Sequence, residues 1–130
     1  MTQENRTRIL AVEDNPDTQL LLRYLLKPHY ELEIVPRVDE AVRVASENRY
    51  DVLLLDINLG EERTGIDLLR ALREMPGYAR TPALALTAYA MPGDRERFVS
   101  SGFDGYVSKP FTRKELFEAI RIVLEASGRG

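Results

Sequence analysis

Polar side chains stand at or just after the ends of four short apolar runs in the sequence. They are Glu13, Asp14, Asp56, Thr87 and Lys109. Three carboxylates brought together repel one another, and they cannot all stay ionised cheaply unless a cation lies among them. The ligands offered are oxygen atoms with no histidine nearby, which favours Mg²⁺ over zinc. The residue types therefore predict a magnesium site, provided that the chain brings them together.

Asp56 is the candidate nucleophile of this set, and its chemistry would be attack on phosphorus. A metal ion and Lys109 would neutralise charge on the transferring oxygens, while Thr87 would donate a hydrogen bond to one of them. Ala88, next to Thr87, would leave the pocket open. The sequence thus indicates an aspartyl phosphate.

Each of these residues has a simpler explanation when taken alone. Acids such as Glu13 and Asp14 are favoured at a helix entry by the helix dipole. Asp56 follows a run in the way that many turn-forming residues do, Thr87 resembles an ordinary strand-end hydroxyl, and Lys109 resembles a solvated charge before a proline. The order of acid pair, acid, hydroxyl and ammonium at successive strand ends is what favours the chemical interpretation.

Five apolar runs alternate with five amphipathic segments, as in a parallel sheet covered by helices on both faces. The runs are residues 9–12, 32–35, 52–55, 83–86 and 106–107. This alternation predicts a doubly wound α/β fold with a five-stranded parallel sheet and five helices. Ligands bind such sheets outside the carboxyl ends of the strands, where the polar side chains stand.

Local signals mark several helix ends. Asn15 can cap a helix whose first residue is Pro16, and Gly102 can end the fourth helix. Thr112 and Glu115 have the spacing of a capping box at the start of the last helix. The third helix is expected from about Gly65.

The composition predicts one globular domain. The chain has 130 residues, 44% of them hydrophobic, and no cysteine. We expect a domain at residues 8–126, after a disordered or extended segment at 1–7 and before a flexible tail at 127–130. With no apolar run long enough to span a bilayer and a net charge of −3 without a basic cluster, we expect a cytoplasmic protein that binds neither membranes nor, directly, nucleic acids.

The sequence resembles the receiver domains of response regulators in two-component signalling, including the chemotaxis regulator, from about Arg8 to Leu124. The matching segments are residues 12–16, 53–58, 86–88 and 102–111. The resemblance implies a flavodoxin-like strand order 2-1-3-4-5. It also implies that the domain is a signalling module whose only catalysis is its own phosphorylation and dephosphorylation.

The resemblance further implies that Asp56 receives its phosphoryl group from a histidine kinase, a histidine phosphotransfer protein or a small phosphodonor. It implies Mg²⁺ held by Asp14, Asp56 and the backbone carbonyl of Asn58, with Glu13 acting through water. Thr87 and Lys109 would hold the phosphoryl oxygens, and the Lys109–Pro110 bond would be cis.

Tyr106 occupies the position of the family's switch aromatic residue. On phosphorylation Thr87 would move toward the phosphoryl group and Tyr106 would enter the space it leaves, changing a face made by the fourth helix, fifth strand and fifth helix. A downstream effector protein would bind this face, and a phosphorylation-linked dimer is a further option. The simpler explanation for Tyr106 is a half-buried aromatic residue with its hydroxyl in water.

Two residues are candidates for tuning the lifetime of the phosphoryl group, namely Asn58 and Tyr89, whose ring would shield the acyl phosphate. The segment at residues 59–65 has Gly60 where many receivers carry proline and is about one residue longer. Its charges are interpreted as a solvated tip, or alternatively as a means of discriminating between kinases. His29 follows Pro28 in a loop and is given no role.

Other classes of protein fit the sequence less well. A haloacid-dehalogenase-type phosphatase also forms an aspartyl phosphate with Mg²⁺, but it would need an Asp-x-Asp pair after the first strand. A flavin-binding domain would need a phosphate loop there rich in serine, threonine or glycine. A pseudo-receiver that docks proteins without being phosphorylated stays open as an alternative.

Overall fold

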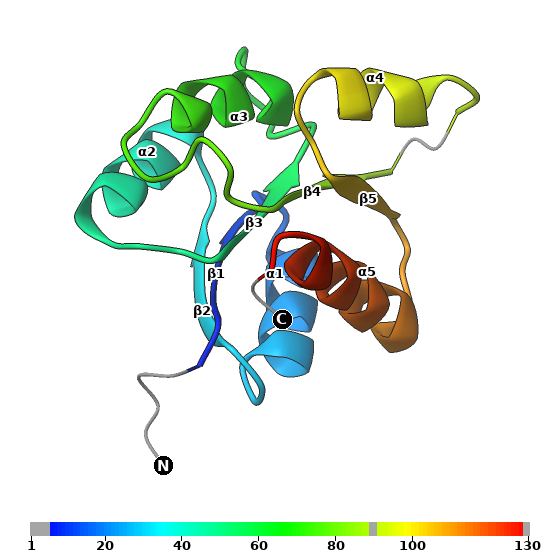
Figure 1. Ribbon diagram of the computed structural model, residues 1–130. Coiled ribbons are helices and arrows are strands. Elements are labelled where there is room, and N and C mark those ends of the chain that lie inside the picture. Colours follow the sequence, from blue (N-terminus) through cyan, green and yellow to red (C-terminus); the bar gives the residue numbers. More distant parts are fainter. Residues whose placement is uncertain (1–5, 89–90, 129–130) are drawn as a thin grey trace.

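The protein forms a parallel sheet of five strands in the order β2-β1-β3-β4-β5 (Figure 1). The structure is a computed structural model that describes residues 6–88 and 91–128. The strands are β1 (Arg8–Val12), β2 (Glu31–Val35), β3 (Val52–Asp56), β4 (Ala83–Thr87) and β5 (Gly105–Ser108). The predicted sheet and its strand order are confirmed.

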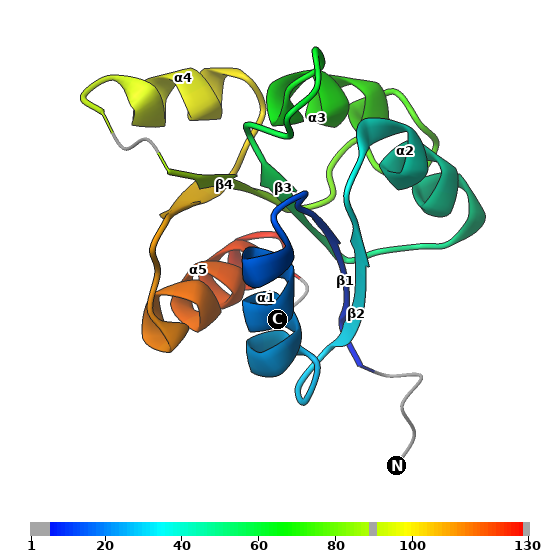
Figure 2. The same ribbon diagram turned by 180° about the vertical axis from the view of Figure 1, so that it is seen from behind.

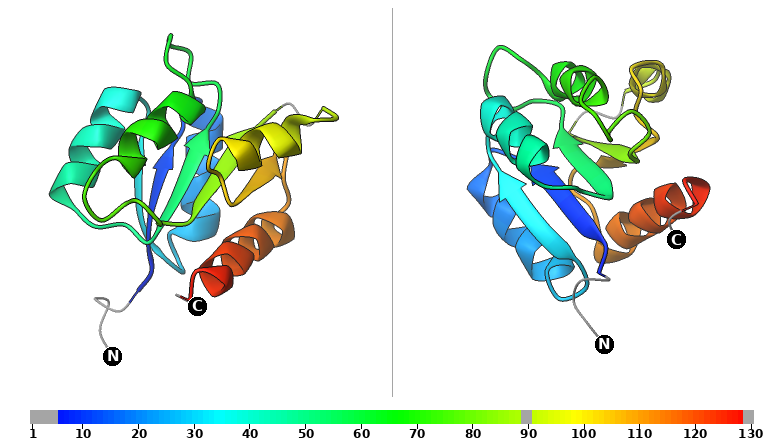
Figure 3. Two further views of the ribbon diagram at one scale, coloured as in Figure 1. Left: turned by 45° about the horizontal axis from the view of Figure 1, so that its top comes forward. Right: turned by 60° about the vertical axis from the view of Figure 1, so that its left-hand side comes forward.

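Five helices in the described residues cover the two faces of the sheet. They are α1 (Pro16–Leu26), α2 (Val38–Glu47), α3 (Gly65–Arg73), α4 (Asp94–Ser100) and α5 (Arg113–Ala126). Helices α2, α3 and α4 lie on one face, and α1 and α5 lie on the other (Figures 1 and 3). Each face has its own cluster of buried apolar side chains, so the fold is a three-layer sandwich.

The central strands are buried on both faces, which explains why their sequences are apolar without alternation. Every residue of β3 and β4 is buried. The edge strand β2 is only partly buried and carries Glu31 and Glu33. An apolar run without polar alternation therefore indicates a strand in the centre of the sheet, and not only a strand.

The helix ends follow the local signals in the sequence. The Asn15 side chain accepts hydrogen bonds from the backbone of Asp17 and Thr18, and Pro16 begins α1. Thr112 and Glu115 form the predicted capping box of α5. A glycine, Gly102, follows α4 with a φ of 106°, a conformation that favours glycine.

Part of each predicted terminal segment is hydrogen-bonded to the domain. Arg6 donates from its guanidinium to the carbonyl oxygens of Lys27 and Tyr30. The amides of Ser127 and Gly128 donate to carbonyl oxygens of α5. Residues 1–5 and 129–130 lie outside the described residues, so the predicted domain limits stay predictions. Among the described helices, none is long and apolar enough to cross a membrane.

Candidate functional site

The strand register places the predicted site residues at one edge of the sheet. Val12 pairs with Leu55, so the next residues, Glu13 and Asp56, lie side by side. A pocket of about 410 Å³ opens beyond these strand ends. Its lining includes Glu13, Asp14, Asp56, Asn58, Thr87 and Lys109. Figure 2 shows this side of the molecule, where β1 leads into α1.

Lys109 joins two buried carboxylates at the base of the pocket. Its Nζ lies 2.8 Å from Oε1 of Glu13 and 2.7 Å from Oδ2 of Asp56. Glu13 is 1% exposed and Asp56 is 3% exposed. The second oxygens accept from backbone amides, Oε2 of Glu13 from Asn15 and Oδ1 of Asp56 from Asn58, each at 2.9 Å. Both carboxylates are therefore held by two contacts each.

The two buried acids share one ammonium, and burial raises the pKa of one of them, Glu13. Burial raises the pKa of Glu13, the hydrogen bonds from Lys109 and Asn15 lower it, and the neighbouring Asp56 raises it; together these effects bring the pKa to about 7. Burial lowers the pKa of Lys109, but its hydrogen bonds to Asp56 and Glu13 outweigh this effect and leave it above the usual value. Lys109 thus stays charged. Its one positive charge cannot balance three carboxylates, so the site can accept a further cation.

The donor set fits a magnesium ion. Glu13, Asp14 and Asp56 each offer a carboxylate oxygen, and these atoms lie within 4.8 Å of one another. Asp14 and Asn58 are exposed at the rim of the pocket, which leaves room for the waters that Mg²⁺ usually keeps. All the ligands are oxygens, as Mg²⁺ prefers.

Two glycines allow the backbone to approach the acids closely. A Cβ atom at Gly65 would clash with the carbonyl oxygen of Asp56. Gly60 has a φ of 70°, and a Cβ there would lie 2.9 Å from Oδ2 of Asp14. The sequence singled out Gly60 only as a departure from the usual pattern. Its contact with Asp14 depends on tertiary structure, and no sequence signal reports it.

The segment after β3 differs from the predicted solvated tip. The side chain of Glu61 is only 9% exposed, and its Oε2 accepts a hydrogen bond from the Val38 amide at the start of α2 at 3.0 Å. Thr64 and Asp67 form a second capping box, at α3, which their spacing in the sequence could have predicted. The solvated interpretation is therefore wrong for Glu61, although Glu62 is exposed.

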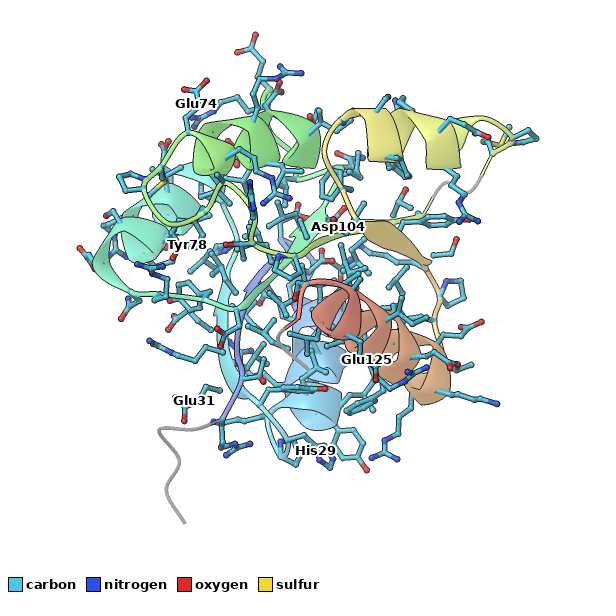
Figure 4. All side chains as sticks on the ribbon, in the orientation of Figure 1. His29, Glu31, Glu74, Tyr78, Asp104 and Glu125 are labelled. Carbon is cyan, nitrogen blue, oxygen red and sulfur yellow. The ribbon has the colours of Figure 1, made fainter. Side chains whose placement is uncertain are left out.

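Other predicted residues lie away from the pocket or outside the described residues. Tyr106 is 36% exposed, and its ring centroid lies 6.0 Å from that of Phe98. It lines a separate groove of about 460 Å³ between α4, β5 and α5. Tyr89 lies outside the described residues. His29 is exposed at the far end of α1 from the pocket (Figure 4).

The backbone after β5 directs Lys109 toward the other strand ends. The Lys109–Pro110 peptide bond is cis, as the resemblance implied. The Lys109 amide donates to the carbonyl oxygen of Thr87 at 2.7 Å, which ties the end of β5 to the end of β4. Thr87 itself is buried.

Comparison with known proteins identifies the family. The sequence profile described as the response regulator receiver domain matches residues 9–121. The chain belongs to this family. The receiver shares 34% identity over 117 residues with the polar-differentiation response regulator DivK of Brucella anthropi, covering 89% of this chain and 94% of DivK. Two-component signalling is thus the setting of this domain.

Two further relatives show how the receiver relates to longer proteins. It is 32% identical over 130 residues to the transcriptional regulatory protein ResD of Bacillus subtilis, covering 99% of this chain but 52% of ResD, so it spans about half that relative's length. The receiver domain of the sensor histidine kinase PA1611 of Pseudomonas aeruginosa is 37% identical, with a TM-score of 0.80 and coverage of 95% and 98%. That structure has a magnesium ion coordinated in its active-site cleft.

Membership of this family decides between two of the alternatives. The receiver is a signalling module rather than a phosphatase of the haloacid-dehalogenase type. Its cluster of Glu13, Asp14 and Asp56 could hold a metal ion, and the similar PA1611 receiver has magnesium in its active-site cleft.

Proposed function

We propose that Asp56 of this receiver accepts a phosphoryl group in a magnesium-dependent reaction. The observation that carries the proposal is the Asp56 carboxylate, buried and 2.7 Å from the Lys109 ammonium, with oxygens of Glu13 and Asp14 close by. A histidine kinase, a histidine phosphotransfer protein or a small phosphodonor would supply the group.

The residues around Asp56 divide the chemistry of transfer among them. A carboxylate oxygen of Asp56 attacks phosphorus while the bond from phosphorus to the donor breaks, and the leaving group takes the electron pair. Lys109 and the Thr87 hydroxyl stabilise the negative phosphoryl oxygens. Asp14, Asp56 and the Asn58 carbonyl would hold magnesium, with Glu13 acting through water. The ion would neutralise negative charge on the carboxylates and on the phosphoryl group. Asn58, at the rim, and Tyr89 are proposed to tune the lifetime of the product.

The proposed output is a change of the face formed by α4, β5 and α5. Thr87 ends β4, beside the strand that carries Tyr106, so a movement of Thr87 toward a phosphoryl group could alter the position of that ring. The groove that Tyr106 lines also includes Val99 and Ile122, both of which are exposed. We propose that an effector protein, or a second copy in a phosphorylation-linked dimer, binds this face.

The proposed docking site for a protein donor is the outer face of α1. This helix begins at Pro16, which lines the pocket. Leu20 and Tyr24, four residues apart on one side of α1, are 67% and 78% exposed. We propose that a protein donor contacts these two exposed apolar side chains.

The test is incubation with Mg²⁺ and acetyl phosphate, followed by intact-mass measurement. We expect the wild-type protein to gain one phosphoryl group and Asp56→Asn to gain none while keeping its circular dichroism spectrum. Chelating the metal should also abolish the gain. A wild-type protein that stays unmodified by acetyl phosphate and by a panel of histidine kinases would instead support the pseudo-receiver alternative.

A further inference from the structure

We infer that Glu61 is a positioning residue for the phosphoryl site, because it fastens the segment between β3 and α3 to the start of α2. This segment, residues 57–64, borders the pocket through Asn58 and Gly60. The right-hand view of Figure 3 shows it beside the start of α2. The consequence for phosphorylation rests on the proposed function, whereas the anchoring itself does not.

Helix α2 lacks a cap from its own sequence. Its N-cap residue is Arg37, whose side chain makes no capping hydrogen bond. The first amides of a helix need acceptors, and a carboxylate is favoured there by the helix dipole. Glu61 supplies this acceptor from 23 residues away, through the 3.0 Å hydrogen bond from the Val38 amide to its Oε2.

Charged neighbours hold the Glu61 carboxylate in this position. Its Oε1 lies 3.6 Å from the Arg63 guanidinium and 3.9 Å from that of Arg37. Arg63 also contacts Oδ1 of Asp39, in the first turn of α2, at 2.6 Å. The Glu61 carboxylate is nearly enclosed, so losing these partners would leave a poorly solvated charge and would cost free energy. The contacts therefore keep Glu61 at the start of α2.

The anchored segment includes the residue that lies against a predicted magnesium ligand. Gly60 precedes Glu61, and a Cβ at Gly60 would reach 2.9 Å from Oδ2 of Asp14. The Gly60 amide also donates to Oδ1 of Asn58 at 3.3 Å. Leu59, on the other side, is buried in the core. The segment is therefore fixed at Leu59 and at Glu61, with Gly60 between them.

A glycine in this position makes the second anchor necessary. Glycine loses more conformational freedom on folding than any other residue, so Gly60 would sample other conformations if the chain after it were free. Those conformations would move the Asn58 carbonyl and the backbone beside Asp14. The contact between Glu61 and α2 restricts the movement of the Asn58 carbonyl and of the backbone beside Asp14. In many metal sites, residues that do not bind the metal hold its ligands in place in this way.

The decisive comparison is between Glu61→Ala and Glu62→Ala. Both variants remove one negative charge from the same segment, but Glu62 is exposed. In Glu61→Ala we expect the dissociation constant for Mg²⁺, measured by calorimetry, to rise about tenfold. We also expect faster hydrogen exchange of the amides of residues 58–60, measured without metal. Glu62→Ala should change neither, and Glu61→Gln, which keeps an acceptor, should fall between wild type and Glu61→Ala.

A second control separates positioning from a general loss of stability. The Tyr78 hydroxyl donates to the carbonyl oxygens of Ala45 and Asn48, at the other end of α2 (Figure 4). Tyr78→Phe should lower the stability of the fold without changing Mg²⁺ affinity or exchange at residues 58–60.

Equal effects of the Glu61 and Glu62 substitutions, or an equal effect of Tyr78→Phe, would overturn the inference. If wild type bound no Mg²⁺, the proposed function would fail, and the exchange rates of residues 58–60 would still decide whether Glu61 anchors the segment.

Discussion

Replacing Glu13 with glutamine is expected to stabilise the metal-free protein at about pH 8 and to flatten the pH dependence of its stability. Burial raises the pKa of Glu13 from 4.5 to about 7 in the folded protein. The unfolded chain has no such burial, so the folded state holds the proton more tightly. Glutamine has the same shape and can still accept from the Asn15 amide, but it carries no charge to bury.

The sign and size of the effect follow from this difference in pKa. A group whose folded pKa is raised stabilises the fold fully below its unfolded pKa and loses that contribution as pH rises through its folded pKa. The rise from 4.5 to about 7 corresponds to about 3 kcal/mol, at 1.36 kcal/mol for each pKa unit. The free energy of unfolding of wild type should therefore fall by about this amount between about pH 5 and about pH 8.

Urea unfolding measures the effect directly. It can be followed by far-ultraviolet circular dichroism at several pH values, without Mg²⁺, for wild type and Glu13→Gln. The difference between the two proteins should be small at about pH 5 and should grow to about 3 kcal/mol at about pH 8. A wild-type stability that stays constant or increases over this interval, or a variant with the same slope, would refute the reasoning about Glu13.

Three further predictions test the rest of the site. Lys109→Met should slow phosphorylation by acetyl phosphate about 100-fold, because an ammonium beside the phosphoryl oxygens is lost. The rate can be measured by quenching the reaction at set times, and an unchanged rate would contradict the role of Lys109 in phosphoryl transfer. Gly65→Ala should lower the free energy of unfolding by about 1–3 kcal/mol, since its Cβ clashes with the Asp56 carbonyl; urea titration would show this, and full stability would argue against the close approach. Tyr24→Ala should slow transfer from a phosphorylated histidine protein but not from acetyl phosphate, and equal slowing with both donors would exclude a docking role for α1.

Much of the site could be predicted because the position of a residue along a strand also fixes its place in space. Asp56 and Lys109 are 53 residues apart in the chain. Each nevertheless follows a strand of one parallel sheet, and such strands end at a common edge. The Asn15 and Thr112 caps were predictable for a related reason, since their partners lie within three residues.

Features that depend on packing could not be predicted in the same way. The contact between Glu61 and Val38 joins two segments whose approach is set by how α2 and α3 pack. The raised pKa of Glu13 depends on the burial of its side chain, and the polar residues that follow it in the sequence do not indicate burial. The ring of Tyr106 lies beside Phe98 of α4, and periodicity in β5 does not report that neighbour.

The most direct test of the account is to identify the residue that carries the phosphoryl group. After incubation with Mg²⁺ and acetyl phosphate, borohydride reduces an acyl phosphate to an alcohol, and peptide mass mapping then locates the change. The account predicts homoserine in place of Asp56, with Asp14 and Glu13 unchanged. Conversion of another acid, or of none while DivK treated in parallel is converted, would contradict it.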